Sequence, residues 1–276
     1  MGRLLVGTSG FSYPDWKGPF YPENLPKAAM LSYYANFFSQ VELDFTYYQM
    51  PGKRSIEGLE RKTPKDFFFC VKAHKSMTHE FFRDCTRDRE NFRYFVEALE
   101  PFLLNGKLGC ILTQFPWGFK YNSANLEYLE FVREELADLP VVVEFRNSEW
   151  LKEEVFYLLH EKEFGYCCVD EPKLKGLLPP LALATSNLGY VRFHGRNAAK
   201  WWRPDEPWER YNYLYSREEL LEWAPRIRKL VGKTENTFVL MNNCHAGHAV
   251  INARMLQEIL SEELGGSTFF VRVSRT

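Results

Sequence analysis

Short stretches of apolar residues recur along the chain, separated by polar and helix-forming segments. Each stretch is rich in β-branched or aromatic side chains and bounded by turn residues, which is typical of buried strands. Most are followed by apolar residues at helical spacing, and this alternation builds parallel sheets from βαβ units. Eight such units predict closure into a (β/α)8 TIM barrel. The predicted strands are residues 4–8, 41–44, 67–73, 108–114, 141–145, 165–169, 190–194 and 237–241.

The segments between the strands place apolar residues three or four positions apart, which gives a helix one face that packs on a sheet. Phe92, Phe95 and Leu99 follow this spacing. Ser216 and Glu219 have the spacing of a capping box, so a helix should begin at this point. The expected apolar face of that helix contains Leu220, Leu221 and Ile227.

Two segments fit a barrel less well. Residues 170–189 form a short connection that contains Pro172, Pro179 and Pro180, so the sixth helix should be irregular or absent. The run 267–273 has the composition of an additional strand that has no place in the barrel. A doubly wound open sheet is therefore the alternative fold.

The length and composition suit one α/β domain. A chain of 276 residues is long enough for a single TIM-barrel domain over residues 1–276. The 45% hydrophobic and 26% charged residues disfavour a disordered chain and a coiled coil. The net charge of -1 gives no overall attraction to nucleic acid, which is therefore not the favoured partner. No pattern in the sequence indicates an oligomeric state.

We expect a cytoplasmic protein that does not act at a membrane. The first residues lead directly into a predicted strand, without the apolar segment and cleavage site of a signal peptide. No uncharged apolar run approaches the roughly 18 residues needed to cross a bilayer. The 6 cysteines form no CxxC pair and most lie in apolar runs, as reduced thiols do.

Polar side chains gather at the carboxyl ends of the predicted strands, where TIM-barrel enzymes have their active sites. Residues two positions apart, such as Arg192 and His194, project from the same side of a strand. If that side faces inward, the charged groups converge, and each then needs a partner or a ligand. The strand-end residues are Glu42, Asp44, Lys72, His74, Gln114, Glu144, Arg146, Asp170, Arg192, His194, Asn242 and Asn243.

The favoured interpretation is an enzyme that binds a small anionic substrate, such as a phosphorylated compound, above the barrel. Glu42 or Glu144 would act as general acid or base. Lys72, Arg146 and Arg192 would hold the substrate or stabilise negative charge. The predicted catalytic residues are Glu42, Lys72, Glu144, Asp170 and His194. The predicted substrate-binding residues are Ser9, Trp16, Gln114, Arg146, Arg192, Asn242, Asn243 and His248.

Two of these residues have more specific expected roles. His194 would shuttle protons, and Asn242 would orient the substrate. An alternative role for Lys72 is that of a Schiff-base nucleophile, if burial lowers its pKa.

The same charges also permit a purely structural interpretation, a closed ion-pair network that fills the top of the barrel. A divalent metal is a further alternative, because Glu42, Glu144, Asp170 and His194 are acceptable ligand types. The similar numbers of positive and negative charges disfavour a metal, so no metal ligand is assigned and the cofactor stays unknown. The segment 244–248 contains Cys and His but lacks the spacing of a zinc site, and a turn is favoured there.

Long aromatic segments follow the first and seventh strands, at residues 9–26 and 196–215, and the second is the best candidate for a lid. Trp16, Trp201 and Trp202 are candidates for stacking on a planar ligand.

Two other groups of residues could meet an anion. Backbone amides at Ser9, Gly10 and Gly195 could bind phosphate, although a plain turn is favoured at each. A cluster of arginines alternates with acidic residues, as on a solvated surface. These arginines are Arg83, Arg87, Arg89 and Arg93.

Ordered motifs run through nearly the whole chain. They include VGTSGFSY at 6–13, GPFYP at 18–22, VEL at 41–43, TYY at 46–48, VKA at 71–73, QFP at 114–116, EFR at 144–146, VRFHG at 191–195 and NN at 242–243. At these motifs the sequence closely resembles the YecE-like family, the barrel proteins assigned to domain of unknown function 72. The resemblance implies a TIM barrel with a pocket at the carboxyl ends of its strands, and no established reaction.

Two positions depart from the family pattern. Asn is usual where this sequence has Asp44, and a second proline often follows Pro116, where this chain has Trp117. The additional negative charge of Asp44 gives the metal alternative some weight. A similarity of these barrels to endonuclease IV-type repair barrels rests on fold analogy. The alternative functions are therefore a nucleic-acid-binding or metal-dependent repair-endonuclease-like protein, and a non-catalytic module that binds a small ligand.

Overall fold

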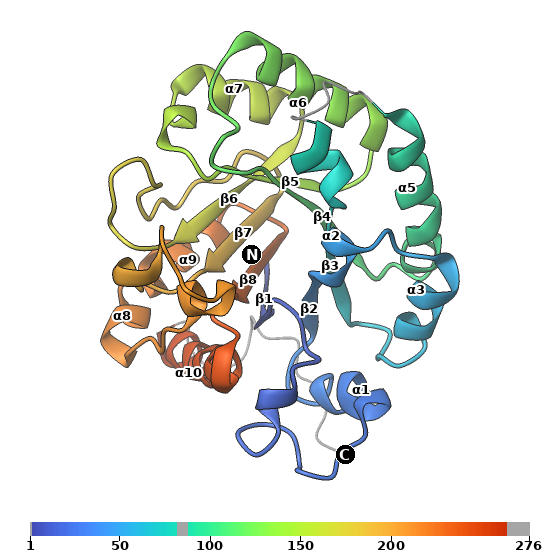
Figure 1. Cartoon of the computed structure of the whole chain (residues 1–276), viewed down its shortest axis with the longest axis vertical. Coiled ribbons are helices and arrows are strands. Elements are labelled where there is room, and N and C mark those ends of the chain that lie inside the picture. The colour runs from blue at the N-terminus through green and yellow to red at the C-terminus, as the bar shows by residue number, and fades with distance from the viewer. Residues whose placement is uncertain (1, 82–87, 264–276) are drawn as a thin grey trace.

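The computed structural model describes residues 2–81 and 88–263 and contains one sheet of eight parallel strands (Figure 1). The strands follow the order β1-β8-β7-β6-β5-β4-β3-β2, so each consecutive strand lies beside its predecessor. This order confirms the TIM barrel and excludes the doubly wound sheet, in which the order reverses. The strands are β1 Arg3–Thr8, β2 Gln40–Leu43, β3 Phe68–Lys72, β4 Leu108–Gln114, β5 Val141–Glu144, β6 Phe164–Asp170, β7 Leu188–Phe193 and β8 Asn236–Met241.

The seam between β1 and β2 is closed mainly by polar contacts. A single bridge joins Ser9 to Glu42. Gln40 reaches across the barrel floor and donates from Nε2 to the carbonyl oxygens of Leu5 and Val239, at 2.9 and 3.0 Å. Gly7 permits this approach, because a Cβ there would lie 2.6 Å from the Gln40 carbonyl oxygen. The barrel is therefore nearly closed.

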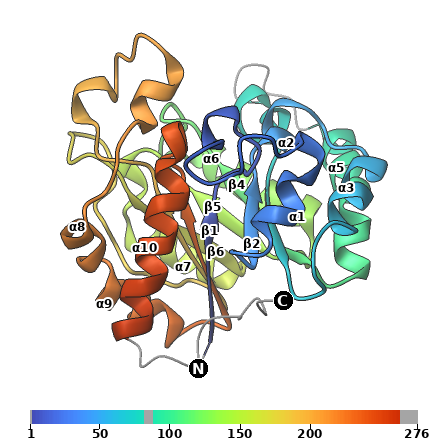
Figure 2. The same cartoon turned by 90° about the horizontal axis from the view of Figure 1, so that it is seen from below.

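Helices surround the sheet (Figure 2). The predicted spacing is confirmed in α5, where Phe92, Phe95 and Leu99 are buried. Phe102 of the same helix stacks on Phe69 with 4.1 Å between ring centroids. The helices are α1 Met30–Tyr34, α2 Phe45–Tyr48, α3 Lys53–Glu60, α5 Arg89–Leu104, α6 Ser123–Leu136, α7 Glu153–Glu161, α8 Arg217–Leu221, α9 Ala224–Val231 and α10 His248–Glu263.

The connection between β6 and β7 confirms the predicted irregularity. Residues 171–187 are all described, and none of them is helical. Polar groups replace helical hydrogen bonds here: Leu178 N donates to Glu171 Oε1 at 2.8 Å, and Thr185 Oγ1 donates to the Phe164 carbonyl at 2.6 Å. The strand-like run 267–273 lies outside the described residues.

The capping box at Ser216 is confirmed, but the helix that follows is shorter than predicted. Ser216 and Glu219 satisfy each other's backbone amides, and α8 ends at Leu221. A second helix, α9, starts at Ala224 with Pro225 in its first turn. Proline has no amide hydrogen to donate to the turn before it, so it interrupts a continuous helix but is tolerated at a helix start. Leu221 is consequently 38% exposed and does not share the buried face of Leu220 and Ile227.

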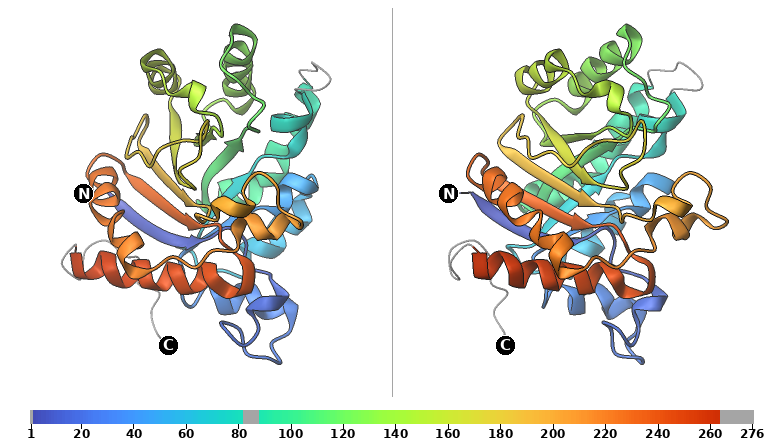
Figure 3. Two further views of the ribbon diagram at one scale, coloured as in Figure 1. Left: turned by 60° about the vertical axis from the view of Figure 1, so that its left-hand side comes forward. Right: turned by 90° about the vertical axis from the view of Figure 1, so that its left-hand side faces the viewer.

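Two loops meet at the carboxyl end of the barrel. The segment 196–215 contains the short helices η5 Ala198–Lys200 and η6 Pro207–Tyr211, and it projects beyond the ends of the strands (Figure 3). The segment 9–26 lies at the same end, in dark blue in Figure 2. Across the described residues, no helix combines the length and apolar character needed to span a bilayer.

Candidate functional site

Arg192 lies at the centre of a charge network inside the barrel. Its Nη2 is 2.6 Å from Oε1 of Glu42, and its Nη1 is 2.7 Å from Oε2 of Glu144. Both carboxylates are fully buried, and Arg192 is 1% exposed. Tyr190 donates to the second oxygen of Glu42 at 2.6 Å. The side chains of Glu42, Glu144 and Arg192 therefore point into the barrel, as predicted for the strand ends. Their charges are paired with one another within the protein.

The two buried carboxylates have opposite pKa shifts. Burial raises the pKa of Glu42 to about 7, because the attraction of Arg192 only partly offsets desolvation. Burial also acts on Glu144, but Arg146, Arg192 and His194 outweigh it and hold the pKa of Glu144 well below its usual value. Glu144 is therefore held as an anion by its ion pairs with Arg146 and Arg192, and this arrangement does not favour the role of general acid or base that the sequence suggested.

His194 is held as a neutral ring. Its Nδ1 lies 2.9 Å from the side-chain nitrogen of Asn242, and its Nε2 lies 3.1 Å from Oε1 of Glu144. Because the Asn242 amide nitrogen only donates, Nδ1 accepts and Nε2 carries the proton. Burial, together with Arg146, lowers the pKa of His194 to about 3. Both ring nitrogens are occupied, so this arrangement leaves none for the predicted proton shuttle, and His194 positions Glu144 and Asn242.

Two adjacent cavities lie above this network, with volumes of about 380 and 370 Å³. They share a wall made by Tyr48, Lys72, Arg146 and Tyr211. Volumes of this size are at the lower end of small-molecule sites.

The first cavity is here called the acceptor compartment and the second the cationic compartment, after their charged and polar groups. Asp15, Asp44, Trp208, Asn242 and His245 line the acceptor compartment. Arg210, Gln114, Trp117 and Trp202 line the cationic compartment, and no described Asp or Glu does so.

Lys72 and Arg146 present donors to both compartments. The nearest carboxylate to Lys72 Nζ is Asp44, at 3.7 Å, and the ammonium group lies 4.7 Å from the ring centre of Tyr47. Arg146 contacts Glu144 through Nε at 2.5 Å. For the terminal amino groups of Arg146, the described residues supply no hydrogen bond or ion pair. These groups are therefore free to bind an anion.

Tyr211 completes the shared wall and comes from the segment 196–215, the candidate lid, which is called the lid below. Burial alone would raise the pKa of its phenol, yet the positive charges of Arg146, Lys72, Arg210 and Arg192 outweigh burial, and the pKa is lowered. Every other described tyrosine with a shifted pKa has it raised. The space around Tyr211 therefore has a positive potential.

Asp170 lies outside the charge network, on the outer side of β6. It accepts hydrogen bonds from Arg196 at 2.7 and 2.9 Å, from Tyr215 at 2.7 Å and from the indole nitrogen of Trp223 at 2.7 Å. Cys167 contacts Glu144, which makes Cys167 inward-facing, and Asp170 three residues later faces the opposite way. The predicted catalytic role of Asp170 is therefore not supported by its position, and the residue attaches the lid base to the barrel.

Trp16 and Asn243 are likewise engaged in hydrogen bonds within the protein. Trp16 is fully buried and donates from its indole nitrogen to the Cys244 carbonyl at 2.7 Å. Asn243 donates to the Tyr213 carbonyl and to Asn252, both at 2.8 Å. Both residues were predicted to bind substrate, and neither lines the acceptor compartment or the cationic compartment.

The remaining predicted binding residues differ in position. Gln114 lines the cationic compartment, and Asn242 lines the acceptor compartment. Ser9 is buried beneath them, 3.4 Å from Arg192 Nη2. His248 begins α10 and does not line either cavity, whereas His245 does.

The backbone amides proposed for phosphate binding are already used. Ser9 N donates to the Met241 carbonyl, Gly10 N to the Glu42 carbonyl and Gly195 N to the Tyr215 hydroxyl. The segment at Cys244 forms a turn ahead of α10, as favoured from the sequence. No group of three His, Cys, Asp or Glu side chains suited to a metal occurs within residues 2–81 and 88–263.

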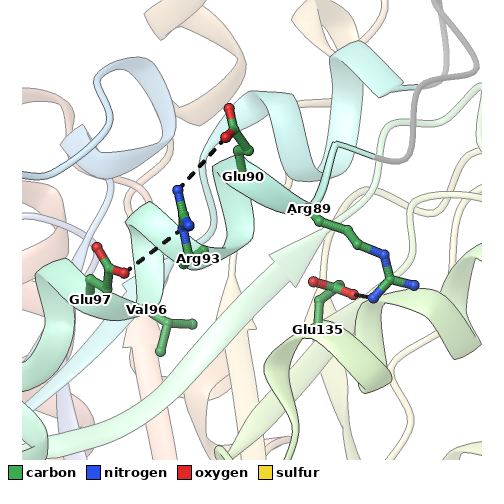
Figure 4. A pocket seen from close by; sticks show the side chains of 6 residues that line it. All are labelled: Arg89, Glu90, Arg93, Val96, Glu97 and Glu135. Carbon is green, nitrogen blue, oxygen red and sulfur yellow. Dashed lines mark hydrogen bonds and ion pairs between the residues drawn. The ribbon is translucent and has the colours of Figure 1, made fainter.

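The arginines of the charged surface are paired with acidic neighbours (Figure 4). Arg93 lies 3.7 Å from Glu90 and 3.9 Å from Glu97, and Arg89 pairs with Glu135. These residues line a surface pocket on α5 and α6 that is separate from the acceptor and cationic compartments, and their pairing fits the solvated-surface interpretation. Arg83 and Arg87 lie outside the described residues.

Several lining residues were not predicted as site residues. Tyr48, Trp208, Tyr211 and His245 come from α2, the lid and the turn before α10. Asp44 was noted as a strand end and as a departure from the family pattern, but it was not assigned as a site residue. The aromatic composition of the lid was the one signal for Trp208 and Tyr211, but it does not tell which rings face the cavity.

The fold and the buried charges define a TIM-barrel protein with a divided polar cavity at the carboxyl ends of its strands. Residues 5–269 match the family model described as "Protein of unknown function DUF72", and the chain belongs to this family. This confirms the resemblance inferred from the motifs.

Three relatives cover nearly the whole chain. UPF0759 protein YunF of Bacillus subtilis (strain 168) is 32% identical over 275 residues, which is 95% of this chain and 96% of that protein. The crystal structure of a DUF72 family protein from Thermotoga maritima MSB8 matches with a TM-score of 0.87 and 41% identity, over 94% of this chain and 99% of that chain. A DUF72 family protein from Enterococcus faecalis V583 matches with a TM-score of 0.83 and 29% identity, over 95% of this chain and 96% of that one. These names state no reaction.

Proposed function

We propose that this protein is an enzyme that binds a small anionic substrate in the cationic compartment and catalyses proton transfer on it. The observation that carries the proposal is the set of donors on Lys72 and Arg146, which face a half-enclosed cavity without a full set of protein acceptors. Partly buried cations in such a position lose some of the hydration that stabilises them, and a bound anion compensates for it. Arg210 adds a third positive charge to the same cavity.

Tyr211 is the acid or base in this proposal. Its phenol lies in the wall between the compartments, and its lowered pKa brings the ionised form closer to neutral pH. Lys72 and Arg146 then stabilise negative charge that develops on the substrate. Glu144 and His194 keep the Arg146 guanidinium in place, and Glu42 is screened from the cavity by burial.

Binding of inorganic phosphate to the full chain, measured by calorimetry, tests the anion site. We expect Lys72→Met and Arg210→Met each to weaken phosphate binding by about tenfold, because one charged contact is lost. Lys53→Met is the matched control, since Lys53 pairs with Glu100 on the outside of the barrel. Equal phosphate affinities in all four proteins would refute the anion site.

We propose that no divalent metal takes part. Three acidic groups, Glu42, Asp44 and Glu144, are balanced by the three basic groups of Lys72, Arg146 and Arg192, which leaves no net negative charge to attract a cation. Elemental analysis of protein purified without chelator should find less than stoichiometric metal. A stoichiometric metal that is lost together with phosphate binding on chelation would overturn this part.

The cytoplasm is the compartment that we propose. Five cysteines are described, all of them buried and none in a disulfide bond, which fits a reducing environment. They are Cys70, Cys110, Cys167, Cys168 and Cys244.

A further inference from the structure

The two compartments differ in hydrogen-bonding character. The cationic compartment offers donors from Lys72, Arg146 and Arg210. The acceptor compartment adds the carboxylates of Asp15 and Asp44 to its lining. A ligand that fills both must therefore carry a negative group at one end and hydrogen-bond donors at the other.

Side-chain oxygens of Asn242, Asp44 and Asp15 in the acceptor compartment can accept further hydrogen bonds from a ligand. Asn242 uses its side-chain nitrogen on His194, so its oxygen is the atom available to a ligand. Oδ1 of Asp44 is buried without a hydrogen bond and lies 3.7 Å from both Lys72 Nζ and Arg192 Nη2. Asp15 receives the Ala246 amide on Oδ2 at 2.6 Å, and no described group hydrogen-bonds to its Oδ1. Hydroxyl or amino groups of a ligand would satisfy these oxygens.

Exposed aromatic rings surround the entrance. Tyr48 is 74% exposed, and Trp117, Trp202 and Trp208 are each between 43% and 48% exposed. All four line the two cavities. Exposed aromatic area costs stability, and its concentration around one cavity marks a binding surface.

The indole ring of Trp208 is positioned to stack against a ligand in the acceptor compartment. His245 lies against one face of its ring, with 4.1 Å between centroids and an interplanar angle of 16°. The contact holds the ring at the wall of the acceptor compartment, where Trp208 is still 45% exposed and can pack against a ligand. The apolar C–H face of a sugar ring, or a planar base, packs well on such a surface.

From these features we infer that the ligand is a phosphorylated sugar, either free or as the ribose phosphate of a nucleotide, with its phosphate in the cationic compartment and its sugar hydroxyls on Asp44 and Asn242. The inference rests on the anion site proposed above and adds the substrate class and its orientation. A phosphomonoester suits three cations better than a carboxylate does, because it carries up to two negative charges. Together the cavities of about 380 and 370 Å³ accommodate a molecule of this size.

Calorimetry with inorganic phosphate, ribose, ribose 5-phosphate and AMP on the full chain tests the inference. We expect ribose 5-phosphate to bind at least about tenfold more tightly than inorganic phosphate, and ribose alone to bind more weakly than ribose 5-phosphate. AMP that binds more tightly than ribose 5-phosphate identifies a nucleotide, and AMP that binds less tightly identifies a free sugar phosphate. Both results support the class.

Two variants separate the sugar contacts from the phosphate contacts. Trp208→Ala should lower the preference for ribose 5-phosphate over inorganic phosphate by about threefold to tenfold, while inorganic phosphate binds as before. Asp44→Asn should lower the same preference but strengthen inorganic phosphate binding, because a negative charge near Lys72 is removed. Tyr157→Ala, which truncates an exposed ring on α7, is the control.

The outcomes distinguish this inference from the proposed function. If inorganic phosphate binds through Lys72 but ribose 5-phosphate binds no more tightly, the sugar phosphate is refuted and the anion site stands. If neither compound binds, both are refuted. A preference for ribose 5-phosphate that is unchanged in Trp208→Ala and Asp44→Asn also refutes the assigned orientation.

Discussion

Arg192 on β7 and Glu144 on β5 form an ion pair of 2.7 Å across the inside of the barrel, with both side chains almost completely removed from solvent. The pair is satisfied by further contacts, since Arg192 also reaches Glu42 and Glu144 also accepts from His194. Such a network forms the floor of the cavity and fixes the groups above it. Its members stabilise one another only as a set.

Replacing Arg192 by Met should therefore be strongly destabilising. The change leaves Glu42 and Glu144 buried without their common partner, and we expect a loss of about 3–5 kcal/mol in the free energy of unfolding. Urea denaturation followed by circular dichroism measures it. Arg93→Met, which removes exposed pairs on α5, should change the same quantity by less than about 1 kcal/mol. Similar losses in both variants would contradict a structural role for the network.

The neutral state of His194 predicts a pH dependence of stability. Its pKa falls from 6.5 to about 3 on folding, so the unfolded chain binds a proton more readily. This residue therefore contributes stability that is present above pH 6.5 and decreases by about 1.4 kcal/mol per pH unit as the pH falls towards 3. In His194→Gln that contribution to the slope should be absent. If the free energy of unfolding changes equally with pH in the parent protein and in His194→Gln between pH 4 and pH 6.5, the folded protein does not hold His194 in its neutral form.

Glu171 should change the free energy of unfolding with pH in the direction opposite to His194, so that its contribution is lost as the pH rises. Burial raises the pKa of its carboxyl from 4.5 to about 7, with Arg146 opposing the shift. The folded state then binds the proton more tightly, so its contribution is present below pH 4.5 and is lost as the pH rises to 7. We expect the stability of Glu171→Gln relative to the parent protein to increase between pH 5 and pH 7. Chemical denaturation at several pH values measures it, and a relative stability that decreases over this range would reverse the assignment.

Tyr211 should ionise before the other tyrosines with shifted pKa values. The surrounding cations lower its pKa, whereas burial raises the pKa of the others, among them Tyr34, Tyr166 and Tyr190. An ultraviolet titration of the folded protein should show an early phenolate step below pH 10 that is missing in Tyr211→Phe. Tyr213→Phe, with a pKa raised to about 12, is the control and should keep this step. An unchanged titration in Tyr211→Phe would remove the support for Tyr211 as an acid or base.

The variant Asp170→Asn distinguishes a structural role of Asp170 from the catalytic role predicted from the sequence. Asp170→Asn should reduce stability by about 1–3 kcal/mol, because a charged acceptor of bonds from Arg196, Tyr215 and Trp223 is weakened. Phosphate affinity should be unchanged, since Asp170 lines neither compartment. Thermal unfolding and calorimetry on one preparation measure both. Loss of phosphate binding at unchanged stability would restore the functional role first assigned to this residue.

The sequence alone determined the barrel and the candidate side chains at its top. The alternation of strand and helix patterns predicts eight βαβ units, and the polar strand ends predict Glu42, Glu144 and Arg192 in one place. Pairs two residues apart within one strand share a side by geometry, which is a local property. The proline-rich connection between β6 and β7 is also local, and its irregularity was predicted correctly.

Tertiary structure decided which polar groups face the cavity. Strands of a parallel barrel are buried on both sides and show no alternation, so the sequence does not reveal that Asp170 and Asn243 face outward while Asn242 faces inward. Tyr211 and Trp208 enter the site only because the lid folds back over strands distant in sequence. The pKa of each group likewise depends on burial and on charges from several strands, and these arise only when the barrel closes.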